Sequence, residues 1–489
     1  MARPKLTFLD QEFIQQIVAE GIAVLSNPGV RVHNSEALAL LADAGAAVDF
    51  NTQVACIPET LALRALDSAP HEFNLYSLEG LAVVHYGGDD VHFDPGSAAV
   101  SILDAQTGQQ RSPVTADFVR FVKLVETLAM FDAQSTAFVC RDVPEGIGDL
   151  YRLYLALEYM HKPIVTGAFG KQTWWVMWEL LCAAAGGEAA LKQRPLAVFD
   201  VCPSPPLLWS DLTCQNLIDC ARKGVPAELV SMPLAGATAP VTLAGSVVQH
   251  TAESLSGVVI HQLAQPGSPI VWGGAPAAFD MRAGSTPFGD VATWMIDCAY
   301  VEVGKYLGLP THAYMGSTDA KLLDMQSGLE SAGGAMLAAL AGVNMVSGAG
   351  MIDFLRCQSF EKLVIDADII AMARRLAQGI ERRHEPVALE VMRQAGHKAG
   401  YLANSHTQRW FRKELHLPSP VIDRSSLDSW QKQGSKSIVT RAAERVEHLL
   451  TTYKPSSLGS DVRQELRRIT LRAAQAYGMD ELPSLPDDK

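Results

Sequence analysis

Residues 196–232, LAVFDVCPSPPLLWSDLTCQNLIDCARKGVPAELVSM, are the stretch that decides the fold. The stretch begins with a short apolar segment, Leu196–Cys202, continues with a helical pattern over Leu212–Lys223, and returns to an apolar segment at Ala227–Met232. A strand, a helix and a second strand in such close succession form a β–α–β unit, in which the two strands run parallel in one sheet.

The same alternation extends in both directions along the chain. Further strand-like segments are predicted at Ser135–Cys140, Pro163–Gly167, Pro269–Trp272, Thr311–Met315 and Val343–Ser347. Helical patterns separate them at Leu150–Met160, Gln172–Ala185, Leu243–Gln265 and Val291–Leu307. Such a succession predicts an α/β fold with a parallel sheet covered by helices. A TIM-type (β/α)8 barrel fits better than an open nucleotide-binding sheet, because no glycine-rich fingerprint follows an early strand.

The strand pattern also divides the chain into regions. Residues 1–114 combine helices with short β-like pieces and predict an N-terminal α+β cap packed on the barrel. Residues 115–358 are predicted to form the barrel, with Met351–Leu355 as the candidate for its eighth strand, and residues 359–489 to form a C-terminal helical extension.

Composition excludes several classes of protein. The 489 residues include 40 Lys and Arg against 53 Asp and Glu, a net charge of -13, which disfavours binding to nucleic acid phosphates. No apolar run approaches the ~20 residues that span a bilayer, and the N-terminus lacks the apolar stretch of a signal peptide. The eight cysteines form no CxxC pair. We therefore expect a soluble cytoplasmic protein with reduced cysteines and no membrane contact.

Common catalytic and metal-binding signatures are absent. The sequence holds no HExxH, P-loop or G-x-S-x-G motif, and no histidines or cysteines at the spacing of a metal site. We therefore expect no bound metal, and the sequence singles out no catalytic residue. In a TIM-type barrel the site is built from the loops that follow the strands, so the residues just after the predicted strands are the candidates.

Two of these post-strand stretches resemble a known family. Residues 316–330, GSTDAKLLDMQSGLE, and residues 341–351, AGVNMVSGAGM, resemble the trimethylamine methyltransferase superfamily, and weaker matches follow in order along nearly the whole chain. The resemblance implies a TIM barrel that moves a methyl group from a methylated amine to Co(I) of a separate corrinoid protein. The archetype carries pyrrolysine, whereas this chain has only standard residues and is similar to the branch that demethylates quaternary amines such as glycine betaine.

The chemistry of a quaternary amine suits a barrel without pyrrolysine. Such a substrate leaves as a neutral tertiary amine once its methyl group is displaced, so no general acid is required. The protein then has to bind, orient and desolvate the cation.

The resemblance suggests roles for residues at the predicted strand ends. Trp272 and Tyr314, with Phe354 as a third ring, are expected as aromatic walls around a methylammonium group. The carboxylates expected near the cation are Glu253, Asp319 and Glu330. If the substrate bears a carboxylate, its expected partner is His312, Lys321 or Arg356. Each residue also has a structural alternative: rings that cap the barrel core, and carboxylates that cap helices or face solvent.

The resemblance also bears on partners. An Asp-x-His-x-x-Gly run for binding a cobamide is missing, so the corrinoid is expected on a partner protein. Two alternatives stay open: direct methyl transfer to tetrahydrofolate, and a barrel that only binds a methylammonium compound. Apolar helices such as Gly333–Leu340 lead us to expect a homo-oligomer.

Overall fold

Parallel strands form the centre of the molecule. The computed structural model describes residues 3–96, 98–105, 107–397 and 400–485. One sheet has the order β15-β13-β11-β10-β9 and a second has the order β17-β18-β6. The strands of the first sheet are β9 (Gln134–Ser135), β10 (Ile164–Thr166), β11 (Ala197–Val201), β13 (Ala227–Leu229) and β15 (Ile270–Val271). Those of the second are β6 (His92–Pro95), β17 (His312–Ala313) and β18 (Met345–Ala349).

Backbone contacts connect the two sheets at both edges. Trp272, directly after β15, pairs in parallel with Thr311, directly before β17. At the other edge, the Asp132 N–H donates to the Phe93 carbonyl at 2.9 Å, and Ala99 pairs in parallel with Phe138. The pairings therefore run from β6 through β9 to β18 and return to β6.

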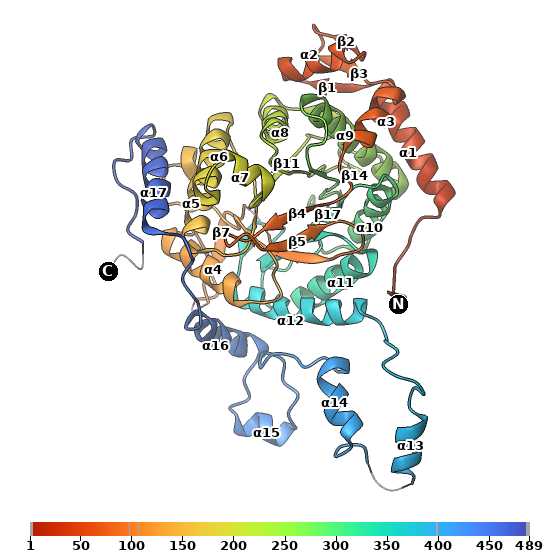
Figure 1. Cartoon of the computed structure of the whole chain (residues 1–489), viewed down its shortest axis with the longest axis vertical. Coiled ribbons are helices and arrows are strands. Elements are labelled where there is room, and N and C mark those ends of the chain that lie inside the picture. Colours follow the sequence, from red (N-terminus) through yellow and green to blue (C-terminus); the bar gives the residue numbers. More distant parts are fainter. Residues whose placement is uncertain (1–2, 97, 106, 398–399, 486–489) are drawn as a thin grey trace.

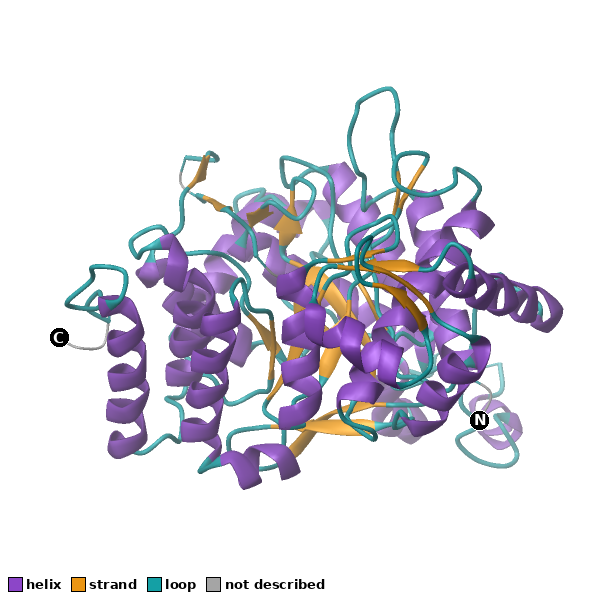
Figure 2. Cartoon of the chain, turned by 90° about the horizontal axis from the view of Figure 1, so that it is seen from above, coloured by secondary structure: helices purple, strands orange, loops and turns teal. Residues whose placement is uncertain are grey.

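Helices surround these strands, as Figures 1 and 2 show. They are α4 (Thr115–Thr127), α5 (Gly148–Tyr159), α6 (Lys171–Ala185), α8 (Asp211–Lys223), α9 (Leu243–Ala264), α10 (Val291–Tyr306), α11 (Met325–Ala341) and α12 (Phe360–Ala377). Local signals set their ends: Ser210 caps α8 by accepting the Thr213 N–H, and Gly224 ends it with φ at 66°. The β–α alternation predicted from the sequence is thus present.

The predicted eighth strand is wrong. Met351–Ile352 (β19) pairs antiparallel with β20 (Cys357–Gln358), and residues 353–355 between them turn back with positive φ. On the other side of β18 from β17, the strand that pairs in parallel is β6, which lies within the range expected for the cap. Its sequence, HFDP, holds a histidine, an aspartate and a proline, so no apolar run marks it.

A hairpin near the N-terminus covers the amino ends of the strands. It consists of β4 (Phe73–Tyr76) and β5 (Ala82–Tyr86), which pair antiparallel. Leu75, Val84 and Tyr86 of this hairpin pack into one apolar cluster with side chains from the starts of the strands, namely Ala133, Val165, Val198, Val271 and Met345. The hairpin therefore fills one end of the space between the strands and leaves the carboxyl end for a site.

The remaining N-terminal elements lie on the outside of the helices. They are α1 (Gln11–Ser26), β1 (Val30–Val32), α2 (Ser35–Asp43), β2 (Ala47–Asp49), β3 (Val54–Cys56) and α3 (Glu59–Ser68). Helices α1 and α3 pack on α9, and β1 pairs in parallel with β12 (Leu208–Trp209), which follows β11.

Shorter elements occupy the loops between the strands and helices. They are β7 (Ser101–Leu103), β8 (Gln110–Arg111), the 3-10 helix Glu145–Ile147, α7 (Glu188–Gln193), β14 (Leu234–Ala235) and β16 (Ala277–Ala278).

The C-terminal region is helical. Its elements are α13 (Leu389–Ala395), α14 (Ser405–Glu414), α15 (Leu427–Lys432), α16 (Ile438–Leu450) and α17 (Ser460–Gln475). Helix α16 packs on α12 and α4, and α17 packs on α6 and α5, whereas α13 to α15 project from the body (Figure 1). Over the described part of the chain, no helix has both the length and the apolar character to cross a membrane.

Two glycines of α11 test how closely this helix packs on the strands. A Cβ at Gly334 would lie 2.1 Å from the Met315 carbonyl oxygen, whereas a Cβ at Gly328 would have no neighbour within 4 Å. We expect Gly334→Ala to lower the free energy of unfolding by about 1–3 kcal/mol. Gly328→Ala should raise it by about 0.5–1 kcal/mol, because alanine favours the helix. Thermal unfolding at one scan rate compares the two, and equal midpoints would contradict the packing.

Candidate functional site

A cavity of about 430 Å³ lies at the carboxyl ends of the parallel strands. Most of its lining comes from residues at or just after those ends: Ala98, Thr136, Gly167, Ala168, Phe169, Asp200, Val201, Cys202, Val230, Met232, Ala275, Tyr314 and Leu355. Helices α5 and α8 add Arg152, Leu212, Thr213 and Asn216. Phe169 and Met232 are 50% and 38% exposed, so the cavity reaches the surface. This is where a site is expected on parallel strands followed by helices.

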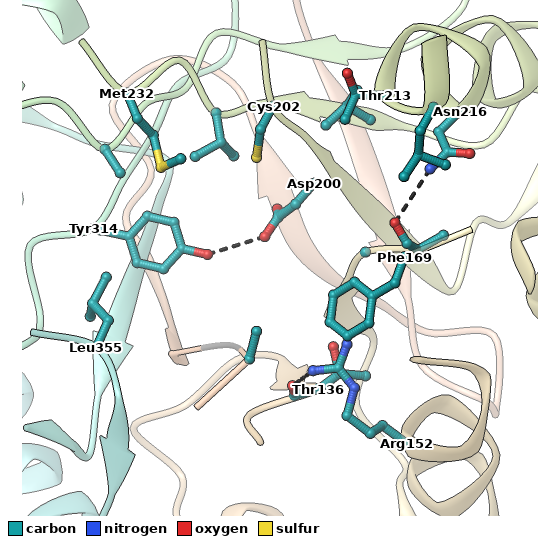
Figure 3. A pocket seen from close by; sticks show the side chains of 17 residues that line it. Thr136, Arg152, Phe169, Asp200, Cys202, Thr213, Asn216, Met232, Tyr314 and Leu355 are labelled. Carbon is teal, nitrogen blue, oxygen red and sulfur yellow. Dashed lines mark hydrogen bonds between the residues drawn. The ribbon is translucent and has the colours of Figure 1, made fainter. Parts of the chain in front are cut away.

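One wall of the cavity carries a carboxylate held by a tyrosine. Tyr314 Oη donates to Asp200 Oδ2 at 3.1 Å, and both side chains face the cavity (Figure 3). Burial raises the pKa of Asp200 to about 6, although hydrogen bonds from Glu228 and Tyr314 and the charge of Arg152 oppose the rise. Asp200 is therefore mostly ionised at pH 7 and places a negative charge in a largely apolar cavity.

A second carboxyl group supports Asp200 from the neighbouring strand. Glu228 of β13 is the direct register partner of Asp200 of β11, and it is fully buried. Burial and the nearby Asp200 raise the pKa of Glu228 well above its usual value. Two carboxyl groups this close cannot both ionise, so they share one proton. Glu228 holds that proton and donates it in a hydrogen bond to Asp200.

Below this pair, buried polar groups continue along the inside of the strands. Tyr86 Oη donates to Glu228 Oε2 at 3.1 Å, and His312 Nδ1 lies 3.3 Å from Glu228 Oε1. The other ring nitrogen of His312 is 3.0 Å from Ser347 Oγ, which donates to Asp94 at 2.5 Å. Burial lowers the pKa of His312 to about 3, so its ring is neutral at pH 7. The hydrogen bond from Tyr86 and the neighbouring His312 ring thus hold Glu228 in place.

The side chain of Arg152 places a positive charge on another side of the cavity. Arg152 of α5 is 1% exposed, its Nη1 donates to the Thr136 carbonyl at 2.6 Å, and its guanidinium lies 4.6 Å from the centre of the Phe169 ring. Burial lowers the pKa of Arg152 to about 10, which leaves it charged at pH 7. The cavity therefore presents charges of both signs.

Of the expected aromatic walls, Tyr314 lines the cavity and Trp272 does not. Trp272 is fully buried in the main apolar core, where its Nε1 donates to the Tyr300 carbonyl at 3.0 Å and its ring contacts His250. Phe354 lies beside the lining residue Leu355, and its ring stacks under Lys321 Nζ at 3.8 Å. Trp272 therefore packs between a strand and the helices outside it.

The expected carboxylates hold loops near the mouth and do not line the cavity. Glu253 is fully buried on α9 and accepts from the Leu207 N–H at 3.0 Å and from Ser231 Oγ at 2.6 Å. Asp319 accepts the N–H groups of Phe288 and Gly289, and burial raises its pKa to about 6. Glu330 accepts the Asp319 N–H at 2.8 Å. Each of these carboxylates ties one post-strand loop to another element.

The residues expected to pair with a substrate carboxylate also lie elsewhere. His312 is neutral and buried beneath Glu228, and Lys321 Nζ donates to the Asp319 carbonyl at 2.7 Å. Arg356 is exposed at the turn between β19 and β20, and its carbonyl accepts the Val100 N–H. The structure places none of the three in the lining of the cavity.

Sequence reasoning missed Arg152 and Asp200, which line the cavity, and Glu228, which lies beside Asp200 on the neighbouring strand. Asp200 and Glu228 are the acidic residues of two short buried strands, AVFDV (β11) and AEL (β13), whereas Arg152 shares the buried helix α5 with Asp149 and Glu158. A charge in a strand covered on both faces has to point into the space between the strands or into the core. A charged residue within a short apolar strand was therefore the signal in the sequence that could have found Asp200 and Glu228.

Comparison with known proteins decides the family. The family model described as trimethylamine methyltransferase matches residues 1–478. The chain belongs to the trimethylamine methyltransferase family. It is accordingly a methyltransferase, as the sequence resemblance implied.

Curated members of the trimethylamine methyltransferase family match over nearly their full length. The trimethylamine methyltransferase of Methanosarcina thermophila is 31% identical over 475 residues, 95% of this chain and 96% of the relative. The corresponding enzyme of Desulfitobacterium hafniense strain DSM 10664 / DCB-2 is 28% identical over 96% of this chain and 95% of its own length. A glycine betaine methyltransferase of Desulfitobacterium hafniense strain Y51 is 28% identical over 97% of this chain and 98% of the relative.

A solved structure shares the fold. The monomethylamine methyltransferase of Methanosarcina barkeri superposes with a TM-score of 0.53 over 91% of this chain and 89% of the other, at 11% sequence identity. At that identity the likeness concerns the fold alone. The mixed α/β architecture of parallel strands surrounded by helices is therefore shared with a methylamine methyltransferase.

A substitution of Trp272 tests whether this ring is part of the core of this methyltransferase. Because Trp272 is fully buried, Trp272→Ala should lower the free energy of unfolding by about 3–5 kcal/mol. Tyr314→Phe removes only one hydrogen bond and should cost about 1 kcal/mol. Denaturant titrations measure both. A fully stable Trp272→Ala protein would show that this ring is not a core residue.

Proposed function

We propose that this methyltransferase demethylates a small quaternary amine of the glycine betaine type and passes the methyl group to Co(I) of a corrinoid carried by a partner protein. The observation that carries the proposal is the ionised Asp200 beside the Tyr314 ring in a largely apolar cavity. A quaternary ammonium group has no N–H to donate, and aromatic faces with nearby negative charge are what bind it. Relatives named for trimethylamine and for glycine betaine support a methylated amine as substrate.

The proposed roles of the residues follow from the charge on the substrate. Asp200 attracts the ammonium group, Tyr314 orients Asp200 through its hydroxyl, and Glu228 holds the carboxylate from behind. The positive charge on nitrogen disappears as the methyl group leaves, so Asp200 stabilises the bound substrate more than the transition state. Its contribution is therefore to binding and positioning.

No residue of the cavity has to supply a proton in this scheme. The corrinoid, when bound, supplies the nucleophile, and a quaternary amine departs as a neutral tertiary amine. The apolar lining keeps water from the methyl group that is to be displaced. The opening beside Phe169 and Met232 fits delivery of the corrinoid by a separate protein, because the cavity is reached from the surface there.

We further propose that the parallel strands close a TIM-type barrel, since their pairings run from β6 back to β6. The cap at residues 1–114, the barrel at 115–358 and the extension at 359–489 remain a prediction, with β6 contributing to the barrel from within the cap range.

The homo-oligomer also remains a prediction. The helix on which it was based, α11, packs on α10 and α12 of the same chain.

The direct test is a methylation assay with reduced free cobalamin. We expect the Co(I) absorbance to disappear in the presence of a quaternary amine such as glycine betaine, and not with the protein or the amine alone. Binding without loss of Co(I), together with methylation of tetrahydrofolate, would establish the folate acceptor instead. Binding without transfer to either acceptor would identify a barrel that only holds the amine.

The pKa of Asp200 predicts a pH dependence of binding. The charge of a quaternary ammonium group is independent of pH, whereas Asp200 becomes protonated as the pH falls through about 6. The apparent affinity should therefore be constant above this pH and fall about tenfold per pH unit below it, because only the ionised fraction attracts the cation.

Asp200→Asn should bind at least about tenfold more weakly than the wild type above pH 6 and lose the pH dependence, because the amide cannot ionise. Calorimetric titrations at several pH values measure both effects. A pH profile that Asp200→Asn leaves unchanged would assign the titration to another group.

A further inference from the structure

We infer that Arg152 is the carboxylate-binding residue of the cavity, so that the substrate is a zwitterion with a carboxylate close to its quaternary ammonium group. This inference rests on the proposed function and names the residue that would bind the carboxylate of its substrate. It also assigns to Arg152 the role that the sequence suggested for His312, Lys321 or Arg356.

The first observation is a buried charge that forms no direct ion pair, although the charges of Asp149 and Asp200 attract it. Arg152 is 1% exposed, and the ion pairs found within the described residues do not include it. One guanidinium nitrogen is used by the Thr136 carbonyl, while the buried Nε has no hydrogen-bond partner in the described structure. A buried cation with unused donors is costly to the fold.

The nearest acidic neighbour on the same helix does not satisfy Arg152. The carboxylate of Asp149 accepts the Phe169 N–H at 2.6 Å and the Thr173 hydroxyl at 2.5 Å. Asp149 therefore anchors the loop that holds the Phe169 ring over the guanidinium. This arrangement orients the guanidinium and leaves its charge available to a ligand.

The second observation is the distribution of charge around the cavity. Of the residues that line it, all within the described part of the chain, Arg152 alone is basic. Figure 3 shows its guanidinium on a different side of the cavity from the Tyr314–Asp200 pair. A ligand with a cation at one end and a carboxylate at the other would meet an opposite charge at each end.

The chemistry of guanidinium makes a carboxylate the fitting partner. Its planar fork of N–H donors matches the two oxygens of a carboxylate, and such charge-assisted pairs are strong when buried. A methylamine without a carboxylate would leave Arg152 unpaired after binding. Two fixed points also orient the substrate better than one, so the same pair positions the methyl group.

The test compares two ligands that share the quaternary ammonium group and differ in the carboxylate: glycine betaine and tetramethylammonium. Isothermal titration calorimetry measures the affinity of the wild-type protein and of Arg152→Gln for each. We expect Arg152→Gln to lower the affinity for glycine betaine about 30-fold or more, which is the effect of removing one partner of a buried charge pair. Tetramethylammonium should bind both proteins with affinities within about threefold of each other.

Two further variants complete the test. Arg152→Lys keeps the charge without the fork and should restore part of the affinity for glycine betaine. Arg463→Gln is the matched control. Arg463 of α17 forms an ion pair with Glu158, which lies on α5 as Arg152 does, but Arg463 does not line the cavity. It should leave both affinities unchanged. Thermal unfolding of each variant shows whether it is folded.

The outcomes separate this inference from the proposed function. Methyl transfer from glycine betaine together with a betaine preference that Arg152→Gln leaves intact would overturn the role of Arg152 and leave the proposed function standing. A wild-type protein that binds tetramethylammonium more tightly than glycine betaine would also overturn the role of Arg152 and leave the proposed function standing. Failure of every quaternary amine to bind would overturn both.

Discussion

The parallel direction of the strands is the constraint on which the rest of this structure depends. Because the strands of the two central sheets pair in parallel, the segments that follow them meet at one end of the molecule, where the cavity lies. The β4–β5 hairpin packs its apolar side chains among the strand starts at the other end. The cavity therefore lies at the carboxyl end of the strands, away from the hairpin.

The interior of the strands is unusually polar, and this carries a cost in stability. Asp94, Asp200 and Glu228 all have a raised pKa because burial disfavours their ionised forms. Hydrogen bonds from Ser347, Tyr314 and Tyr86 offset part of that cost. Such a network holds a single carboxylate at a set place in an apolar cavity, which suits the binding of a small cation.

Carboxylates near the mouth of the cavity hold loops in place and do not line the cavity. Glu253, Asp319 and Glu330 accept backbone N–H groups from post-strand loops, and so they fix the walls of the cavity from outside. Asp319 and Glu330 of the stretch GSTDAKLLDMQSGLE therefore hold post-strand loops and do not line the cavity. Recognition of the substrate is our proposal for Arg152 and Asp200, the charged residues that line the cavity.

The sequence by itself determined the order of strands and helices, because that order depends on short-range spacing and on the alternation of apolar and polar residues. It also carried the family resemblance, which the full-length match confirmed. It did not show that β6 pairs with the central strands, because the four residues of β6 lack an apolar run. Only the tertiary structure decided which residues form the cavity. Arg152, Asp200 and Tyr314 are far apart in the chain, and they meet because strand pairing and the packing of α5 bring their side chains to one place.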